Sequence, residues 1–175
     1  MKINARLNSR DITDTINKIE WFKSDLQRKL ERFVLELADV GIEVVKANTF
    51  VEYDEQYINR GDLIEFSKLI TVEGESVVCR LTAEGIPYTK EWKGGMAQVD
   101  PLLMAEFGSG KYAEPFGMRG KFPNQHVAFL DSWEWTDNSG ITHESSGSVP
   151  SRPMLKAKEE MANQIRAVAE RVFSS

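Results

Sequence analysis

One run of apolar residues constrains the fold of this chain more than any other feature. Within residues 25–46, apolar side chains recur at alternating steps of four and three residues, at Leu26, Leu30, Phe33, Leu37, Val40 and Val44. This spacing places them along one face of an α-helix and leaves charged residues around the rest of it. The sequence therefore predicts a long amphipathic helix over residues 25–46, with residues 1–20 as an N-terminal extension.

The same alternation of steps is also typical of a coiled coil. The run is shorter than four heptads, however, so it does not demand a partner helix. We expect the apolar face to pack against the protein's own sheet, because such a face normally serves the core of its domain.

Composition limits the class of protein. The 175 residues are 41% hydrophobic, which suffices for the core of one domain over residues 1–175. The net charge of −5 argues against tight binding to DNA or to an anionic membrane. The single cysteine, Cys79, rules out an internal disulfide and favours a reducing compartment. No apolar run has the length of a signal peptide or a membrane span, so we expect synthesis and retention in the cytoplasm until lysis.

Two segments in the middle of the chain have the composition of β-hairpins. The runs 63–72 and 76–82 are rich in β-branched residues and are separated by Glu73-Gly74-Glu75. The run 129–136 is followed by the turn residues 137–140 and then by 141–143. We expect these two hairpins to share one antiparallel sheet of about four strands.

Long loops rich in glycine, proline and aromatic residues are predicted for residues 83–126. Aromatic side chains suit loops that dock against another surface better than they suit plain linkers. The alternative is that they fold back over the open face of the sheet. The candidate contact residues are Tyr88, Trp92, Tyr112, Phe116 and Phe122.

The end of the sequence predicts a second helix. Pro153 fits a first helical turn, with Ser151 or Arg152 near the N-cap, and apolar residues then recur on one face up to Val172. The expected fold class is therefore α+β, with a long N-terminal helix and a C-terminal helix packed on the sheet.

Known catalytic patterns find no match in the sequence. His126 and His143 lie outside any zinc-ligand spacing, so we expect no metal and no cofactor. The segment 107–112, FGSGKY, is the nearest approach to a phosphate-binding loop, but Pro115 and Gly117 follow too soon for a helix to open after Lys111. We expect a protein that is not an enzyme.

The order of two short motifs along the chain is informative. The first is Ala105-Glu106-Phe107-Gly108-Ser109-Gly110, and the second is Pro150-Ser151-Arg152-Pro153-Met154-Leu155 at the start of the last helix. This order, beside the two helices, resembles the minor tail, neck or tail-completion proteins of long-tailed bacteriophages. The resemblance runs from the long helix to the end and leaves out residues 1–20.

The resemblance implies a virion structural protein that forms a ring at the head–tail junction. It implies a homo-oligomer, a hexamer being one candidate, with head-closure and tail-tube proteins as partners and no membrane. It places Glu106, Phe107, Gly108, Gly110, Arg152 and Pro153 at a subunit interface, where the glycines let the backbone turn beside a neighbour. Arg152 is either a partner for a carboxylate or for carbonyl groups, or a solvent-exposed arginine at the helix start.

An acidic surface also suits a ring through which DNA passes without sequence-specific binding, because acidic walls repel phosphate and let the duplex slide. Two other classes remain open at this point. One is a small host-directed enzyme or inhibitor, which would need a polar pocket that the sequence does not reveal. The other is an adaptor that binds one partner through its aromatic loops without forming a ring.

Overall fold

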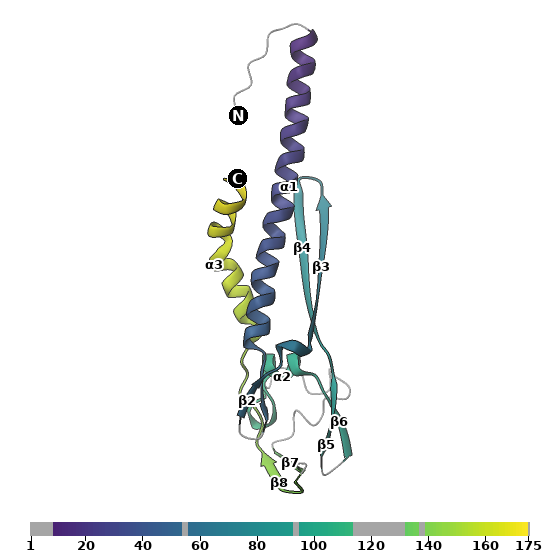
Figure 1. The fold of residues 1–175 in the computed structure, drawn as a ribbon, viewed down its shortest axis with the longest axis vertical. Helices are drawn as coiled ribbons and strands as arrows, with labels where there is room; N and C mark the ends of the chain where they lie inside the picture. Colours follow the sequence, from purple (N-terminus) through teal and green to yellow (C-terminus); the bar gives the residue numbers. More distant parts are fainter. Residues whose placement is uncertain (1–8, 54–55, 93–94, 114–131, 137–138, 175) are drawn as a thin grey trace.

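A computed structural model describes residues 9–53, 56–92, 95–113, 132–136 and 139–174 of the chain. The fold is α+β and elongated, as Figure 1 shows. A long helix, α1 (Ser9–Asn48), runs along the molecule, with a C-terminal helix, α3 (Pro153–Phe173), beside it. A hairpin of two long strands, β3 (Ile64–Glu73) and β4 (Ser76–Gly85), lies along another side of α1. The expected fold class is confirmed.

Helix α1 begins well before the predicted residue 25. Asp11 and Thr13 both lie inside it, in the first turns of the helix. The helix ends where side chains take over its last carbonyl groups: Asn48 Nδ2 donates to the Val44 carbonyl at 2.9 Å, and Thr49 Oγ1 donates to the Val45 carbonyl at 2.7 Å. Such bonds satisfy acceptors that have no partner within the helix.

The β3–β4 hairpin follows the prediction closely. Ile64 pairs with Gly85 and Glu73 with Ser76, so the turn consists of Gly74 and Glu75. Gly74 has a φ of +62°, which glycine adopts readily. Alternate residues of β4 (Val77, Cys79, Leu81 and Ala83) are partly buried, whereas their neighbours are mostly exposed. Partial burial raises the pKa of the Cys79 thiol, which keeps it protonated, as expected for a small apolar residue.

The expectation of one four-stranded sheet is wrong for the residues that the structure describes. Strands β7 (Trp133–Thr136) and β8 (Thr142–Ser145) form the second predicted hairpin, but it does not join β3 and β4. The described strands make four separate two-stranded antiparallel sheets. The two helices pack on each other, and of these two it is mainly α1 that lies against the long hairpin.

Two further stretches, for which no strands were predicted, are also hairpins. Strands β1 (Phe50–Tyr53) and β2 (Gln56–Asn59) pair, as do β5 (Tyr88–Trp92) and β6 (Gly95–Val99). The loops predicted for residues 83–126 therefore contain strands as far as Val99, and then a short helix, α2 (Pro101–Phe107), and a 3-10 turn (Gly110–Tyr112). The rest of that prediction, residues 114–126, lies outside the described residues.

The core forms where α1, α2, α3 and the base of the long hairpin meet. Its buried members are Val45, Ile64, Leu102 and Ala157, with Val44, Phe66, Ala83 and Met154 packed around them. Gly41 allows α3 and β4 to approach α1 closely, since a Cβ there would lie 2.8 Å from the Met161 sulfur and 3.2 Å from Leu81 Cδ2. Further along α3, the ring of Phe173 lies 6.0 Å from that of Phe33.

A charge placed in this core should unfold the protein. Val45 is fully buried, so Val45→Asp puts a carboxylate without a partner among apolar groups. The expected loss of several kcal/mol is comparable to the whole stability of a typical domain. Val149→Asp is the matched control, because Val149 is 49% exposed and should change stability by less than about 0.5 kcal/mol. Circular dichroism and thermal melting measure both, and a native melt for Val45→Asp would contradict this core.

Candidate interaction sites

The two motifs that carry the family resemblance lie against each other in the structure. We call residues 105–111 together with residues 146–154 the junction. Ser109 N donates to the Ser148 carbonyl at 2.9 Å, and Ser148 N donates back to Ser109 Oγ at 2.9 Å. Lys111 N donates to the Ser146 carbonyl at 3.0 Å. The two segments therefore run antiparallel, and both serines are buried.

The junction also connects the ends of three helices. The Ala105 carbonyl at the end of α2 accepts from the backbone nitrogens of Ser151 and Arg152, at 2.8 and 3.0 Å. Ser151 Oγ donates to the Asn48 carbonyl at the end of α1, at 2.7 Å. These bonds satisfy carbonyl groups that a helix end leaves without a partner.

Glu106 caps the start of α3 from a distance in sequence. Its Oε2 accepts from the backbone nitrogen of Met154 at 2.7 Å. A carboxylate is favourable there, because the first N–H groups of a helix are free and its N-terminus carries partial positive charge. The bond that holds Glu106 thus runs to the helix backbone.

The glycines of the junction provide close backbone approach. Gly108 and Gly110 have φ values of +74° and +63°, and both are buried. A Cβ on Gly110 would overlap the Ser146 carbonyl oxygen and lie 2.7 Å from Gly147 Cα. The backbone N–H groups of Ser109 and Lys111 are used within the chain. This agrees with the rejection of a phosphate-binding loop, since that role needs such groups to be free.

The six residues predicted for a subunit interface thus lie close together at the junction. They differ in how far their side chains are exposed. Gly108, Gly110 and Pro153 are buried, and Glu106 and Phe107 are partly buried. Arg152 is exposed and forms the N-cap of α3 in a left-handed conformation, with φ 53° and ψ 54°. A non-glycine residue in this conformation carries strain. Of the six, Arg152 offers the most surface to a neighbour.

Among the predicted loop aromatics, Tyr88 and Tyr112 have side chains that the structure describes. Tyr88 in β5 is partly buried, with the Arg60 guanidinium 6.0 Å from its ring centre. Tyr112 is 42% exposed, and Lys111 Nζ lies 4.9 Å from its ring centre. Trp92 belongs to β5, and Phe116 and Phe122 lie outside the described residues.

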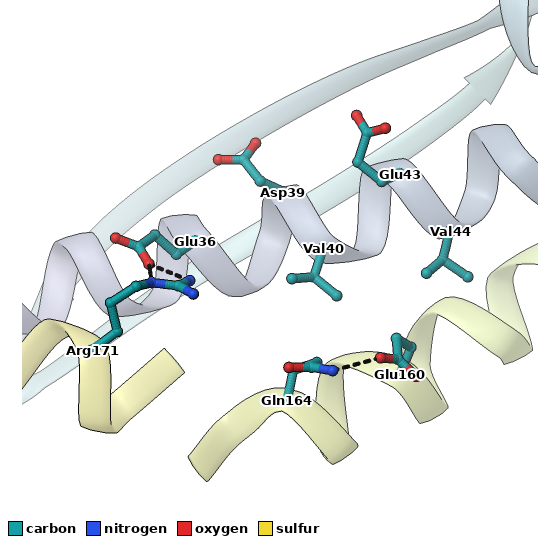
Figure 2. A pocket seen from close by; sticks show the side chains of 8 residues that line it. All are labelled: Glu36, Asp39, Val40, Glu43, Val44, Glu160, Gln164 and Arg171. Carbon is teal, nitrogen blue, oxygen red and sulfur yellow. Dashed lines mark hydrogen bonds and ion pairs between the residues drawn. The ribbon is translucent and has the colours of Figure 1, made fainter. Parts of the chain in front are cut away.

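A second feature is an open groove of about 650 Å³ between α1 and α3 (Figure 2). Val40 and Val44 point from α1 toward α3 and make its apolar floor. Acidic side chains also line the groove: Glu36 and Glu160 lie beside the floor, whereas Asp39 and Glu43 point from α1 away from α3 (Figure 2). Arg171 closes one end, where its Nη2 lies 2.6 Å from Glu36 Oε2.

The acids of the groove differ in their partners. Arg171 and Arg32 both contact Glu36 and lower the pKa of its carboxyl group. Asp39 pairs with Lys68 of β3 at 2.7 Å, and Glu160 accepts from Gln164. Within the described part of the chain, Glu43 is exposed and has no ion-pair partner. It is the acid in the groove most available to an incoming cation.

A further apolar surface lies on the part of α1 that precedes the predicted helix. We call residues 9–26 of α1 the arm. It projects beyond α3 and the long hairpin (Figure 1). Ile12, Ile16, Ile19, Phe22 and Leu26 are between 39% and 50% exposed and fall at helical spacing. They extend the predicted apolar face backward, a signal already present in steps of three and four from Leu26.

Comparisons with models of known protein families, with curated proteins and with solved structures give no match. Within the described residues, no group of three or more His, Cys, Asp or Glu side chains is placed to hold a metal ion. None of the helices in those residues has the length and apolar character needed to cross a membrane.

The effect on stability of the close approach at Gly110 can be distinguished from the effect of its positive φ by a comparison with Gly74. Gly74 has nearly the same φ, but a Cβ there meets no atom within 4 Å. Gly74→Ala should therefore lower the free energy of unfolding by about 1 kcal/mol through conformation alone. Gly110→Ala should lower it by at least about 3 kcal/mol, because the two segments must also separate and lose hydrogen bonds. Urea denaturation compares the two, and equal losses would contradict the close approach.

Removal of the Glu106 carboxylate should weaken the start of α3. We expect Glu106→Ala to lower the free energy of unfolding by about 1–2 kcal/mol, as for the loss of an N-cap acceptor. Glu106→Gln should lose less, because its amide oxygen can still accept from Met154 N. Glu159→Ala, at an exposed position of the same helix, is the control for loss of a negative charge. An equal loss in Glu159→Ala and Glu106→Ala would show that the cap contributes nothing.

Proposed function

We propose that this chain is a ring-forming structural subunit at the head–tail junction of a long-tailed bacteriophage or prophage. In this role it belongs to the virion, is present in the host cytoplasm during assembly, and contacts head-closure and tail-tube proteins. DNA passes through the ring without sequence-specific contacts, and the subunit has no catalytic role.

The observation that carries this proposal is the meeting of the two motifs at the junction. Residues 105–110 and 150–155 carry the resemblance to one family, and they lie against each other in the structure. The Ala105 carbonyl accepts from Ser151 and Arg152, and Glu106 accepts from Met154. Two motifs that build one structural unit are better support for a shared origin than either short motif alone.

The exposed apolar surface supports a subunit that acts in an assembly. The arm carries several large apolar side chains that the described chain leaves exposed. Apolar patches of this kind are uncommon on proteins that act alone and usually mark contacts with other molecules. The net charge of −5 also suits a channel for DNA, since an acidic wall does not hold phosphates.

A test of this role is complementation of a phage that lacks the gene. Without it, filled heads and separate tails should accumulate. Arg152→Ala should give a folded protein that joins heads to tails poorly, because loss of an interface arginine typically weakens a contact by about 2 kcal/mol and a ring repeats that loss. Joined particles are counted by electron microscopy.

The control is Arg166→Ala, which removes an exposed arginine from α3 that pairs only with Glu170 among the described residues. It should join heads to tails like the wild type. Wild-type joining by Arg152→Ala would exclude Arg152 from the interface. Wild-type joining in the absence of the gene would refute the proposed role.

A further inference from the structure

The arm and the groove lie on the same helix, so one copy cannot bring them together. The apolar residues of the arm fall between positions 12 and 26, and the groove residues of α1 fall between 36 and 44. Helix α1 is continuous across both, and a continuous helix cannot fold back on itself. A contact between these two surfaces therefore requires two molecules.

We propose that the arm of one copy docks in the groove between α1 and α3 of a neighbouring copy. This inference rests on the proposed function only in taking the chain to assemble with itself, and it names the surfaces by which it does so. Because arm and groove are different surfaces, a pair would still offer one free arm and one free groove. Such a contact propagates into a ring when the rotation closes.

The apolar parts of the two surfaces match. Ile16 and Ile19 are each 50% exposed on the arm. The groove has an apolar floor, Val40 and Val44, which lies open between α1 and α3. The same face of α1 is covered by α3 further along, where Phe173 meets Phe33. A neighbour's helix in the groove would therefore pack on the same face of α1 that α3 covers elsewhere along the helix.

The charges decide between this contact and a pairing of two arms. Lys23 lies four residues after Ile19 and three before Leu26, so it falls on the apolar face of the arm. It is exposed, and within the described chain it has no ion-pair partner. If two arms packed face to face, each Lys23 would be buried against apolar side chains or against the Lys23 of the other molecule. Either contact is unfavourable for a charged group. In the groove, Lys23 would instead lie near carboxylates, and Glu43, at the edge of the groove on the side of α1 that points away from α3, is available to pair with it.

Charge reversal tests the pairing in purified protein. Sedimentation of the full chain over a range of concentrations measures the dissociation constant of self-association. Lys23→Glu and Glu43→Lys should each weaken association at least tenfold, because each places like charges together. The double variant should recover most of the loss. Lys158→Glu, at an exposed position of α3 outside the groove, is the control and should associate like the wild type.

Mixing two defective copies tests the geometry. Ile16→Asp damages the arm and leaves the groove intact, and Glu43→Lys damages the groove and leaves the arm intact. Each alone should remain monomeric at concentrations where the wild type assembles. Together they should form pairs and stop there, since only one intact arm and one intact groove are present. Pairing of arm with arm instead predicts that Glu43→Lys, whose arm is intact, still associates with itself when it is alone.

Several results would overturn the inference. These are wild-type protein that stays monomeric at high concentration, association unchanged by Lys23→Glu, no pair in the mixture, or an arm that binds another virion protein in place of a copy of itself. The phage experiment is independent of them. Sedimentation that follows the expected pattern while phages lacking the gene still join heads to tails would refute the proposed role and leave the inference intact.

Discussion

The fold depends on three helix ends that satisfy one another. The last carbonyl groups of α1 and α2 accept from the segment that leads into α3, and the first turn of α3 finds its acceptor on Glu106 at the end of α2. A helix end buried without partners is unfavourable, so these bonds must form together. They fix the direction in which α3 leaves the base of the molecule. That direction lays Val168 and Val172 against α1, where both are buried, and so creates the groove as well as the core.

Local patterns in the sequence predicted the elements that carry strong periodicity. The apolar spacing in residues 25–46 correctly predicted a helix, and the alternation on either side of Gly74 predicted the long hairpin almost to the residue. Pro153 correctly marked the start of α3. These signals work because they depend on residues that are neighbours in the chain. The hairpins β1–β2 and β5–β6 were not predicted, because glycine and mixed polar residues in short strands weaken the alternation that marks a strand.

How these elements pack together was harder to predict from the sequence. Which hairpins share a sheet depends on contacts between distant residues, and the separate pairing of β3–β4 and β7–β8 has no local signal. The arm lies outside the predicted helix, because Lys23 interrupts its apolar face and because residues 1–20 were predicted to be an N-terminal extension. The junction was found through resemblance, and its buried serines, Ser109 and Ser148, carry no signal of their own. Short polar residues in a glycine-rich segment fit a surface loop equally well.

The bond between Ser151 and Asn48 joins positions that are 103 residues apart. During synthesis, α1 and the long hairpin leave the ribosome well before the residues that complete the junction. The face of α1 that α3 covers therefore stays uncovered until α3 has been synthesised, and so does the floor of the groove. Partly made chains expose both the arm and this uncovered face, and exposed apolar surface makes such intermediates prone to aggregate. A nascent chain of this protein is accordingly a natural client for chaperones until α3 docks.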